Sequence, residues 1–334
     1  MHTTSTADAP RLIALDWGTS ALRAWLLGDD ARIIAARQRD SGLLSVTTGA
    51  DAETRARDYA RAFADVCADW LEAHPGLPVI ACGMVGSAQG WRETGYLTVP
   101  TPLAIGAETL TPVPHDHGIL RLIPGLRVEH GGGAGAGDVM RGEETQLIGI
   151  MRLLEEPAGE LLVVLPGTHT KWVNIRAHQV LSFTTAMTGE LYGLLTRHGI
   201  LARTAAATAG ATAVDEAAFA RGLDADTSRG VAAALFGARA LVLDNLLEPG
   251  SLPDYVSGLL IADEVRHLLP GHRTDQPIIL CGNTDLCRRY AAALERHDVR
   301  PAASFTEEAA ALGLWTVAVN AGLIGPTQRI EEIS

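Results

Sequence analysis

The sequence predicts an α/β fold made of two halves, and two observations support that prediction. The first is a repeated pattern: an apolar run, a turn with glycine and hydroxyl residues, and a returning run occur at Leu15–Ser20 and again, about half a chain later, at Leu165–Thr170. The second is the alternation of strand-like apolar runs with stretches of helical periodicity. A chain of 334 residues is also long enough for about two domains.

The first half is expected to begin with an antiparallel meander, because three apolar runs are separated by short polar turns. Tyr59, Phe63 and Trp70 then recur at helical spacing, and Asp51 can cap the start of that helix. Several prolines between residues 95 and 118 predict a long loop. The expected elements are strands at 11–16, 21–27, 32–38, 77–82 and 119–129 and helices at 51–73 and 138–154.

The second half is expected to open with a hairpin of two apolar strands and then to become mainly helical, because long stretches of helical periodicity follow. A strand–helix–strand–helix series is expected to finish the fold. The expected elements are strands at 160–166, 171–176, 180–183, 277–281 and 299–304 and helices at 187–198, 214–222, 228–247, 254–268, 285–297 and 306–323.

The composition is that of a soluble chain with a sizeable core, since 47% of the residues are hydrophobic and 20% are charged. The formal net charge of −12 argues against a nucleic-acid partner, whose phosphates require clustered positive charge. No run of about 18 apolar residues is present, so we expect no membrane span. The four cysteines form no C-x-x-C pair, and the first ten residues lack a signal-peptide core. We therefore expect reduced thiols and a cytoplasmic protein.

The first repeated turn has the residues of a phosphate-binding hairpin. Gly18, Thr19 and Ser20 offer backbone N–H groups and hydroxyls, which can bind phosphate oxygens. Asp16 directly before the turn could hold Mg²⁺, which prefers carboxylate and water ligands. Arg23 on the returning strand could neutralise charge during phosphoryl transfer. The alternative is a plain β-hairpin, which the second copy of the pattern makes less attractive.

The second repeated turn carries Gly167, Thr168 and Thr170, and it is followed by Lys171. Lys171 is the only lysine of the chain, since the other basic residues are all arginine. A cation at a phosphate-binding hairpin suits an anionic ligand. The alternative is that Lys171 is an ordinary exposed strand residue.

Asp138 is a candidate general base. It follows a glycine-rich run at residues 131–137, which does not match the G-x-G-x-x-G dinucleotide pattern, and it stands at the expected start of a helix. A carboxylate that faces a cleft there can remove a proton from a substrate hydroxyl. The alternative is that Asp138 only caps the helix. Arg141 is expected one helical turn away, on the same face.

A small-residue loop after the strand at 77–82 is a candidate sugar pocket. Ser87 and Gln89 could donate hydrogen bonds, and Trp91 could supply an aromatic wall. The alternative is a generic glycine-rich loop.

Taken in order, these patterns resemble those of the sugar-kinase/actin superfamily of two-lobed ATPases, in which each lobe has a ribonuclease-H-like mixed sheet flanked by helices. Within that superfamily the chain resembles the 2-dehydro-3-deoxygalactonokinase family. The segment that resembles the adenosine motif has one glycine, Gly282, where a pair is usual. The segments that carry the two resemblances are Asp16–Arg23, Gly137–Gln146, Leu165–Trp172, Met187–Leu191, Cys281–Asn283 and Glu307–Leu314.

The resemblance implies ATP-dependent phosphorylation of the terminal (6-) hydroxyl of 2-dehydro-3-deoxy-D-galactonate, in galactonate breakdown. It implies an N-terminal lobe at 11–152 completed by a C-terminal helix at 312–330, and a C-terminal lobe at 153–311. It also implies roles for the candidate residues: Asp16 for the metal, Asp138 as base and Arg23 on the transferring group, with Gly282 and Asn283 at the adenosine end and Gly18, Thr19, Ser20, Gly167, Thr168, Thr170 and Lys171 around the phosphates.

Several alternatives stay open at this level. An arginine is expected to hold the substrate carboxylate, because its fork matches a planar carboxylate. Arg141, close to Asp138, is favoured, and Arg92, which follows the pocket loop, is the alternative. The substrate could be another keto-deoxy sugar acid or a sugar, and an actin-like or exopolyphosphatase-like phosphohydrolase is the alternative reaction. A DNA-binding regulator is disfavoured, since the first strand begins near residue 11 and the net charge is negative. The oligomeric state is open, with a homodimer as one option.

Overall fold

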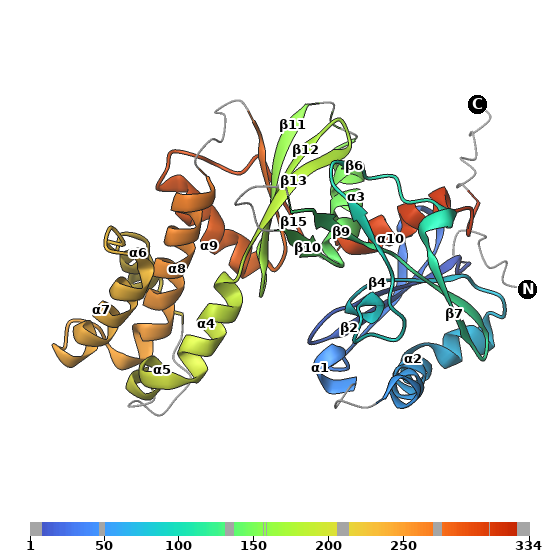
Figure 1. Ribbon diagram of the computed structural model, residues 1–334, viewed down its shortest axis with the longest axis horizontal. Helices are drawn as coiled ribbons and strands as arrows, with labels where there is room; N and C mark the ends of the chain where they lie inside the picture. Colours follow the sequence, from blue (N-terminus) through green and yellow to red (C-terminus); the bar gives the residue numbers. More distant parts are fainter. Residues whose placement is uncertain are drawn as a thin grey trace, which may run out of the picture. The chain divides into compact units, whose positions relative to one another are not determined.

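The computed structural model describes residues 9–46, 51–130, 137–155, 157, 159–205, 214–269, 276–306 and 308–325. The chain divides into two compact units (Figure 1). Unit 1 comprises Met1–Ala158, Arg176–Ser182 and Glu307–Ser334, and unit 2 comprises Gly159–Ile175 and Phe183–Thr306.

Unit 1 is built on a six-stranded mixed sheet of order β3-β2-β1-β4-β8-β7. Within this sheet β1 pairs antiparallel with β2 and parallel with β4, which places Asp16 opposite both Arg23 and Cys82. A second, three-stranded sheet has the order β10-β9-β5. The strands are β1 (Leu12–Trp17), β2 (Leu22–Leu27), β3 (Ile33–Arg39), β4 (Val79–Gly83), β5 (Tyr96–Thr98), β6 (Thr101–Pro102), β7 (Thr111–His115), β8 (Gly118–Leu122), β9 (Gly125–Val128) and β10 (Asp138–Met140).

The helices of unit 1 follow from caps and small residues in its sequence. Asp51 caps α2 as expected, since its side chain accepts hydrogen bonds from the N–H groups of Glu53 and Thr54. Gly149 and Gly313 let α3 and α10 approach each other closely, because a Cβ at either glycine would overlap backbone of the other helix. The helical segments are η2 (Asp29–Ala31), α1 (Leu43–Val46), α2 (Ala52–Ala73), η3 (Met84–Gly86), η4 (Ala107–Thr109), α3 (Glu143–Leu153) and α10 (Glu308–Asn320).

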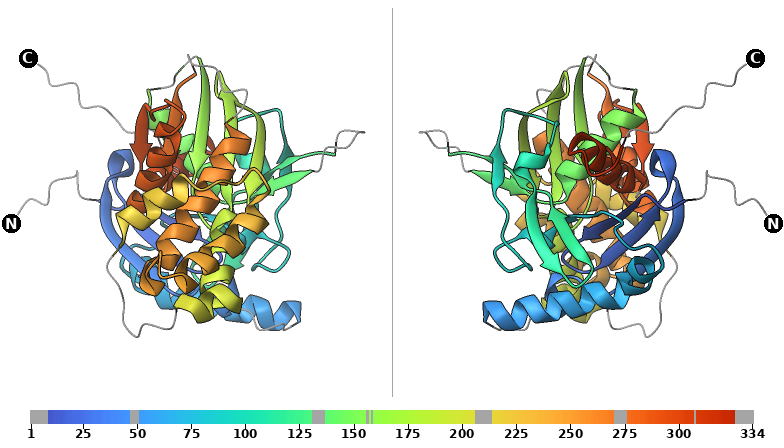
Figure 2. Two further views of the ribbon diagram at one scale, coloured as in Figure 1. Left: turned by 90° about the vertical axis from the view of Figure 1, so that its left-hand side faces the viewer. Right: turned by 90° about the vertical axis from the view of Figure 1, so that its right-hand side faces the viewer.

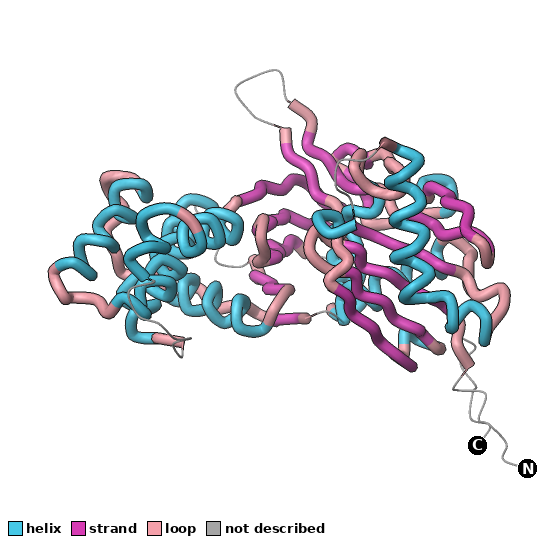
Figure 3. The backbone as a smooth tube through the Cα atoms, turned by 90° about the horizontal axis from the view of Figure 1, so that it is seen from below, coloured by secondary structure: helices cyan, strands magenta, loops and turns pink. Residues whose placement is uncertain are grey.

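Unit 2 has a sheet of order β15-β14-β11-β12-β13, and the first residues of β13, which belong to unit 1, pair with β6. Strands β11, β14 and β15 are parallel. Helices gather at one end of this unit and strands at the other (Figure 2, Figure 3). The elements are β11 (Glu160–Leu165), β12 (Thr170–Arg176), β13 (Gln179–Ala186), α4 (Thr188–Arg197), α5 (Gly199–Ala205), α6 (Glu216–Leu223), α7 (Val231–Leu243), η5 (Pro249–Ser251), α8 (Leu252–Leu268), β14 (Ile278–Cys281), α9 (Thr284–Glu295) and β15 (Ala303–Phe305).

The expected α/β fold class, with a mixed sheet and flanking helices in each half, is confirmed. The expected loop between residues 95 and 118 is wrong, because it contains β5, β6 and β7. The expected strand at 119–129 is two strands, β8 and β9, which separate at the residues around Pro124. Helix α5 had no counterpart in the expectation. In the described part of the chain, no helix combines the length and the apolar character of a membrane span.

The expected helix from Asp138 is also wrong at its start. Asp138 lies in β10, and α3 begins only at Glu143. The break is Gly142, whose φ of +109° suits glycine and ends the extended segment with a sharp turn. Asp138 is therefore not a helix cap, and Arg141 does not share a helical face with it. The predicted C-terminal helix ends at Asn320, and residues 326–330 of that prediction, like the glycine-rich run at 131–136, lie outside the described residues.

Candidate active site

The first repeated turn, between β1 and β2, is tightly closed and exposed at its tip. The N–H of Gly18 donates to the carbonyl of Ala21 at 2.9 Å, and Thr19 and Ser20 are exposed. Gly42 packs against the back of this turn so closely that a Cβ there would overlap the Ser20 backbone. The turn thus presents backbone N–H groups and hydroxyls from a fixed base. Sequence analysis did not find the role of Gly42, because only the folded chain brings it to the turn.

Asp16 lies at the end of β1, beside this turn. Its Oδ2 is 3.5 Å from Nη1 of Arg23, and its Oδ1 accepts a weak hydrogen bond from the Cys82 Sγ at 3.8 Å. The Asp16 side chain is 18% exposed, so the carboxylate is not sealed from solvent. Burial raises the pKa of the Cys82 thiol well above its usual value, and the Asp16 charge adds to that shift. Cys82 therefore stays a neutral thiol beside the carboxylate.

Asp138 is positioned by a sheet rather than by a helix. It pairs with Val128 across the β9–β10 ladder, and its Oδ1 accepts a hydrogen bond from the N–H of Val139 at 2.7 Å. Its side chain is partly exposed. A half-exposed carboxylate that follows a glycine-rich segment can take up a proton, which is the chemistry proposed for it from the sequence.

Arg141 is held by Thr94 and Tyr96. Its Nη1 donates to the Thr94 hydroxyl, its Nη2 donates to the Thr94 carbonyl at 3.2 Å, and its guanidinium carbon lies 4.3 Å from the Tyr96 ring centroid. Gly86 lies next to this guanidinium, since a Cβ on Gly86 would be 3.1 Å from Nη1. The structure therefore brings Arg141 to the loop that carries Ser87.

The rest of that loop is divided between surface and core. Ser87 is buried and Gln89 is exposed. Trp91 lies in an aromatic cluster, with its ring centroid 6.3 Å from Tyr59 and 5.7 Å from Phe63. In this position Trp91 supports the loop from the core side of the sheet.

Glu144 is a buried carboxyl that sequence analysis missed. It is fully buried in the first turn of α3, where it accepts hydrogen bonds from the Gly142 N–H at 2.6 Å and the Thr145 hydroxyl at 3.2 Å. Burial, reinforced by the negative charge of Glu143, raises the pKa of Glu144 to about 8. The available signal was the acidic pair directly after Gly142, since acidic residues favour a helix N-terminus.

The second repeated turn, between β11 and β12, is supported by the start of α4. Gly189 packs directly on Gly167, because a Cβ there would overlap the Gly167 carbonyl. The N–H of Glu190 donates to the carbonyl of Thr168 at 2.9 Å, and the Glu190 carboxylate lies 2.5 Å from the His169 imidazole. The segment Met187–Leu191, which carried part of the family resemblance, therefore forms the base of this turn.

Lys171 lies inside unit 2. Its side chain is buried, and its Nζ donates to the hydroxyl of Thr185 on β13 at 2.8 Å. The alternative of an exposed strand residue is therefore wrong. The neighbouring Thr170 is also buried.

A hydrogen-bonded network connects the second turn to three other elements. The Thr170 hydroxyl is 2.8 Å from the Tyr290 hydroxyl, and Tyr290 donates to the Glu264 carboxylate at 2.7 Å. The other Glu264 oxygen accepts from the Trp172 indole at 2.6 Å. Burial raises the pKa of Glu264, while the hydrogen bonds that it accepts oppose that shift. The network joins β12, α8 and α9 around one buried carboxyl.

A cavity of about 310 Å³ opens beside this network, wholly within unit 2. It lies at the carboxyl ends of the parallel strands β11 and β14, where open α/β sheets bind ligands. Its lining residues are Gly167, Thr188, Gly189, Tyr192, Val214, Ser257, Leu260, Ile261, Asn283, Asp285, Leu286, Arg288, Arg289 and Tyr290. A larger cavity of about 960 Å³ in unit 1, lined mainly by α3, α10 and the turn at Ala177–Gln179, contains none of the candidate residues.

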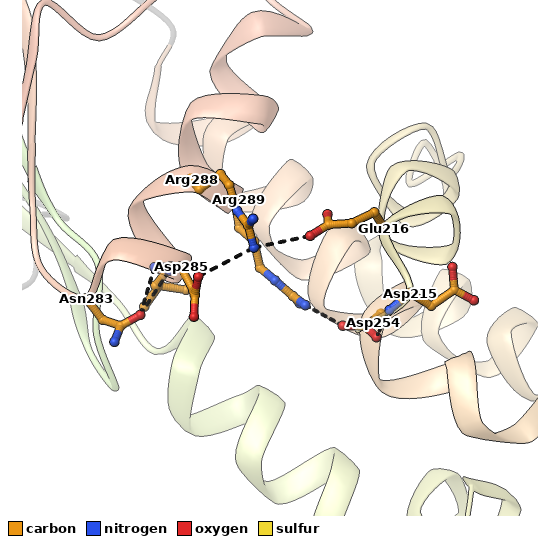
Figure 4. Close-up of polar contacts among 8 residues, drawn as sticks. Asp215, Glu216, Asp254, Asn283, Asp285, Arg288 and Arg289 are labelled. Atoms are coloured by element: carbon orange, nitrogen blue, oxygen red, sulfur yellow. Dashed lines mark hydrogen bonds and ion pairs between the residues drawn. The ribbon is translucent and has the colours of Figure 1, made fainter. Parts of the chain in front are cut away.

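Ion pairs fix one wall of the unit 2 cavity (Figure 4). Arg288 lies 3.2 Å from Glu216 and 3.5 Å from Asp285, and Arg289 pairs with the buried Asp254. Both arginines belong to α9, so the pairs hold this helix to α6 and α8. The arginine pair and its acidic partners were not found from the sequence, because the partners come from distant segments.

The predicted adenosine segment reaches the same cavity. Asn283 caps α9, since its Oδ1 accepts from the N–H groups of Asp285 at 3.0 Å and Leu286 at 3.2 Å. Gly282 packs on the strand before the second turn, because a Cβ there would lie 2.9 Å from the Pro166 carbonyl. The structure thus brings Gly167, Gly282 and Asn283 together at one sheet edge.

The residues present fit a magnesium ion that is carried mainly by phosphates. In the described part of the chain, no group of three His, Cys, Asp or Glu residues could by itself hold a metal ion. Mg²⁺ bound with a nucleotide keeps several waters and needs only one or two protein carboxylates. Asp16 is such a carboxylate, partly exposed beside the first turn.

The chain was compared with known proteins. Residues 16–317 match the family model of 2-keto-3-deoxy-galactonokinase. The chain is 35% identical over 303 residues to a probable 2-dehydro-3-deoxygalactonokinase of Rhizobium meliloti (strain 1021), covering 90% of this chain and 94% of that protein. It is also 35% identical over 285 residues to the 2-dehydro-3-deoxygalactonokinase of Escherichia coli (strain K12), covering 85% and 89%.

A solved structure supports the same assignment. The crystal structure of a Sinorhizobium meliloti protein assigned as a 2-dehydro-3-deoxygalactonokinase matches 92% of this chain and 98% of its own, with a TM-score of 0.79 and 33% identity. The fold, the ordered sequence segments and the family match therefore agree. The chain belongs to the 2-keto-3-deoxy-galactonokinase family.

Proposed function

We propose that this protein transfers the terminal phosphoryl group of ATP to the 6-hydroxyl of 2-dehydro-3-deoxy-D-galactonate. The observation that carries the proposal is the family match over residues 16–317, which includes every candidate residue of both repeated turns. The relatives that match over most of the chain are named for this reaction. The site features described above supply the physical parts that such a reaction needs.

In this proposal unit 2 binds the nucleotide. The cavity beside Gly167 and Asn283 has apolar walls from Leu260 and Ile261, which suit a base, and polar groups at the sheet edge, which suit ribose and phosphates. Gly282 keeps the adenosine segment close to Pro166, beside the second turn. The backbone N–H groups and hydroxyls of Thr168 and its turn bind phosphate oxygens.

Unit 1 carries the residues proposed for the metal ion and the transferring group. Thr19 and Ser20, on the turn that the Gly18 N–H closes, offer a second set of donors, and the Asp16 carboxylate would bind the water shell of Mg²⁺. When bound, the ion would offset the negative charge of the phosphates. Arg23, at 3.5 Å from Asp16, stabilises the charge that develops on the transferring group.

The substrate side is proposed around Asp138 and Arg141. Asp138 accepts the proton of the 6-hydroxyl as that oxygen attacks the phosphorus atom. Arg141 binds the substrate carboxylate through its planar fork, with Ser87, Gln89 and the Trp91-supported loop completing the pocket. Two buried polar atoms support a ligand here: the Arg141 Nε and the Ser87 Oγ find no hydrogen-bond partner among the described residues.

The experiment that tests the function is a coupled ADP-release assay on the purified protein. We expect turnover with 2-dehydro-3-deoxy-D-galactonate and at least about tenfold lower kcat/KM with its C4 epimer and with neutral hexoses, since a single mispaired hydroxyl or a lost carboxylate contact costs about that factor or more. Equal rates across the panel would contradict the substrate assignment. ADP release at the same rate without any sugar acid would instead identify a phosphohydrolase.

The same proposal places the enzyme in the cytoplasm. Cys67, Cys82, Cys281 and Cys287 are all free and buried, as is usual where thiols stay reduced. The proposed partners are the small-molecule substrate and the nucleotide.

A further inference from the structure

Helix α7 of unit 2 has an unusual surface. Its 13 residues, Val231–Leu243, are apolar or small on every side, with Arg239 as the one charged residue. A helix that is apolar all round is normally buried on all sides. Here only Ala238 is buried, whereas Phe236 is 63% exposed and Leu243 is 64% exposed. Leu246, just beyond the helix, is 60% exposed.

The position of α7 explains why unit 2 does not cover it. It packs on one side against α8 and α5, and it lies at the end of unit 2 away from the sheet (Figure 1, Figure 2). The exposed side carries Phe236 and Leu243, two turns apart, with Gly237 and Ala240 between them. An added Cβ on Gly237 would meet no atom within 4 Å, so the helix surface is open between the two large side chains.

We propose that this face binds a second copy of the same chain, with the two α7 helices packed antiparallel about a two-fold axis near Gly237. In that arrangement Phe236 of each subunit packs over Gly237 and Ala240 of the other. Two-fold dimers require a patch that is complementary to itself. A nearly uncharged face with large and small residues in alternation meets that requirement.

The charges at the two ends of α7 support the antiparallel arrangement. Arg229 is exposed just before the helix, and Asp244 is exposed just after it. Gly237 is close to the midpoint between them in the sequence. A two-fold axis there places Arg229 of one subunit opposite Asp244 of the other, twice. A parallel arrangement would bring like charges together. The antiparallel arrangement also aligns the helix dipoles favourably.

The size of this face determines how strongly the two copies are expected to associate. A helix of 13 residues is about 20 Å long and about 10 Å wide, so the face offers only a few hundred Å². Stable complexes use about 800 Å² from each partner. We therefore expect a dimer that dissociates on dilution, with a Kd on the order of micromolar.

The test uses the full chain and analytical ultracentrifugation from about 0.1 to 100 times the expected Kd. Wild type should shift from monomer to dimer across this range. Gly237→Glu, which adds a side chain where nothing else lies, should remain monomeric with normal secondary structure and unchanged kcat. The matched control, Ala217→Glu on the exposed side of α6, should dimerise like wild type. Phe236→Ser should weaken association at least tenfold.

A cross-linking variant tests the geometry. Gly237→Cys should form a disulfide-linked dimer on mild oxidation, because the two-fold axis brings the two thiols together, while Ala217→Cys should not. The native cysteines are buried and should not interfere. A wild-type monomer throughout the range would overturn the proposal, because the face would then not bind a second copy of the chain. So would a Gly237→Glu protein that still dimerises, because its interface would lie elsewhere.

Discussion

The hydroxyl of Tyr290 donates a hydrogen bond of 2.7 Å to the buried carboxylate of Glu264. Tyr290 lines the unit 2 cavity, and its hydroxyl also contacts Thr170 beside the second turn. Glu264 does not line the cavity, so in the proposed nucleotide site it would act only through the residues that it holds. Glu264 is therefore a positioning residue for this part of the site.

The first prediction concerns that carboxyl. Glu264→Leu should lower the free energy of unfolding by roughly 2–4 kcal/mol. The Tyr290 hydroxyl and the Trp172 indole would lose their acceptor, and each buried donor without a partner costs about 1–3 kcal/mol. It should also weaken ADP binding several-fold. Glu264→Gln should have a smaller effect on both, since its amide can pair with both groups. Urea unfolding and calorimetric ADP titration measure these quantities.

Exposed Glu295 on α9 supplies the control for this comparison. Glu295→Gln should change neither the free energy of unfolding nor the ADP affinity. If Glu264→Leu reduced stability but left ADP affinity unchanged, the carboxyl would have a purely structural role. Rescue of ADP affinity by Glu264→Gln is the result that supports positioning.

The second prediction concerns Asp138. Asp138→Asn should lower kcat by roughly 10²–10⁴, because the variant keeps the shape of the side chain and loses its capacity to accept a proton. The KM values for ATP and sugar acid should stay within a few-fold of wild type. Steady-state kinetics measure both. The exposed Asp116 provides a matched variant, Asp116→Asn, which should be fully active. Near-normal turnover in Asp138→Asn would remove Asp138 from the base role.

The third prediction concerns the substrate carboxylate. Arg141→Met should raise the KM for the sugar acid about tenfold or more and leave the KM for ATP nearly unchanged, as expected for a lost charged hydrogen bond of about 1.5–3 kcal/mol. Arg141→Lys should have a sugar-acid KM between those of wild type and Arg141→Met, since lysine keeps the charge but lacks the guanidinium fork.

Two further variants separate carboxylate binding from loop support. Arg92→Met should leave the sugar-acid KM unchanged, because Arg92 is exposed and Arg141 is proposed to bind the carboxylate. Thr94→Val removes the hydroxyl that holds Arg141 and should raise that KM by a smaller factor. A normal KM in Arg141→Met, with a raised KM in Arg92→Met, would exchange the two assignments.

The fourth prediction concerns pH. The folded protein raises the pKa of Glu144 from an ordinary glutamate value of 4.5 to about 8. Between these values the folded state binds the proton more tightly than the unfolded state. The contribution of Glu144 to stability is therefore fully present below about pH 4.5 and is lost as the pH rises through about 8. The loss amounts to roughly a few kcal/mol at most.

Glu144→Gln tests this contribution, because the amide keeps the shape and cannot titrate. Relative to wild type, the variant should gain in Tm as the pH is raised from 5 to 8.5. Glu53→Gln at an exposed position should follow wild type at every pH. A constant Tm difference between wild type and Glu144→Gln across this range would show that the carboxyl does not titrate there.

Much of the candidate site was predictable from short segments. The Gly18 and Gly167 turns and the Asp51 cap depend on local chemistry, so the sequence pattern was sufficient. Asn283 was found only through the family resemblance. The start of α3 was mispredicted because Gly142 adopts a positive φ that apolar periodicity does not reveal. The segment with prolines between residues 95 and 118 was assigned to a loop because its strands are short, and β6 and β7 themselves contain proline.

The sequence by itself determined the α/β class, the repeated turns and the family, because these depend on residue order and local spacing. Only the tertiary structure decided which distant groups meet: Gly42 behind the first turn, Arg141 on Thr94, and Glu264 on Tyr290 and Trp172. It also decided that Lys171 is buried, although a charged side chain is usually exposed. In the same way it decided that α7 is largely exposed, although an apolar helix is usually buried. The physical reason is that burial and partner choice depend on all the surfaces packed around a residue, and those surfaces come from segments far apart in the chain.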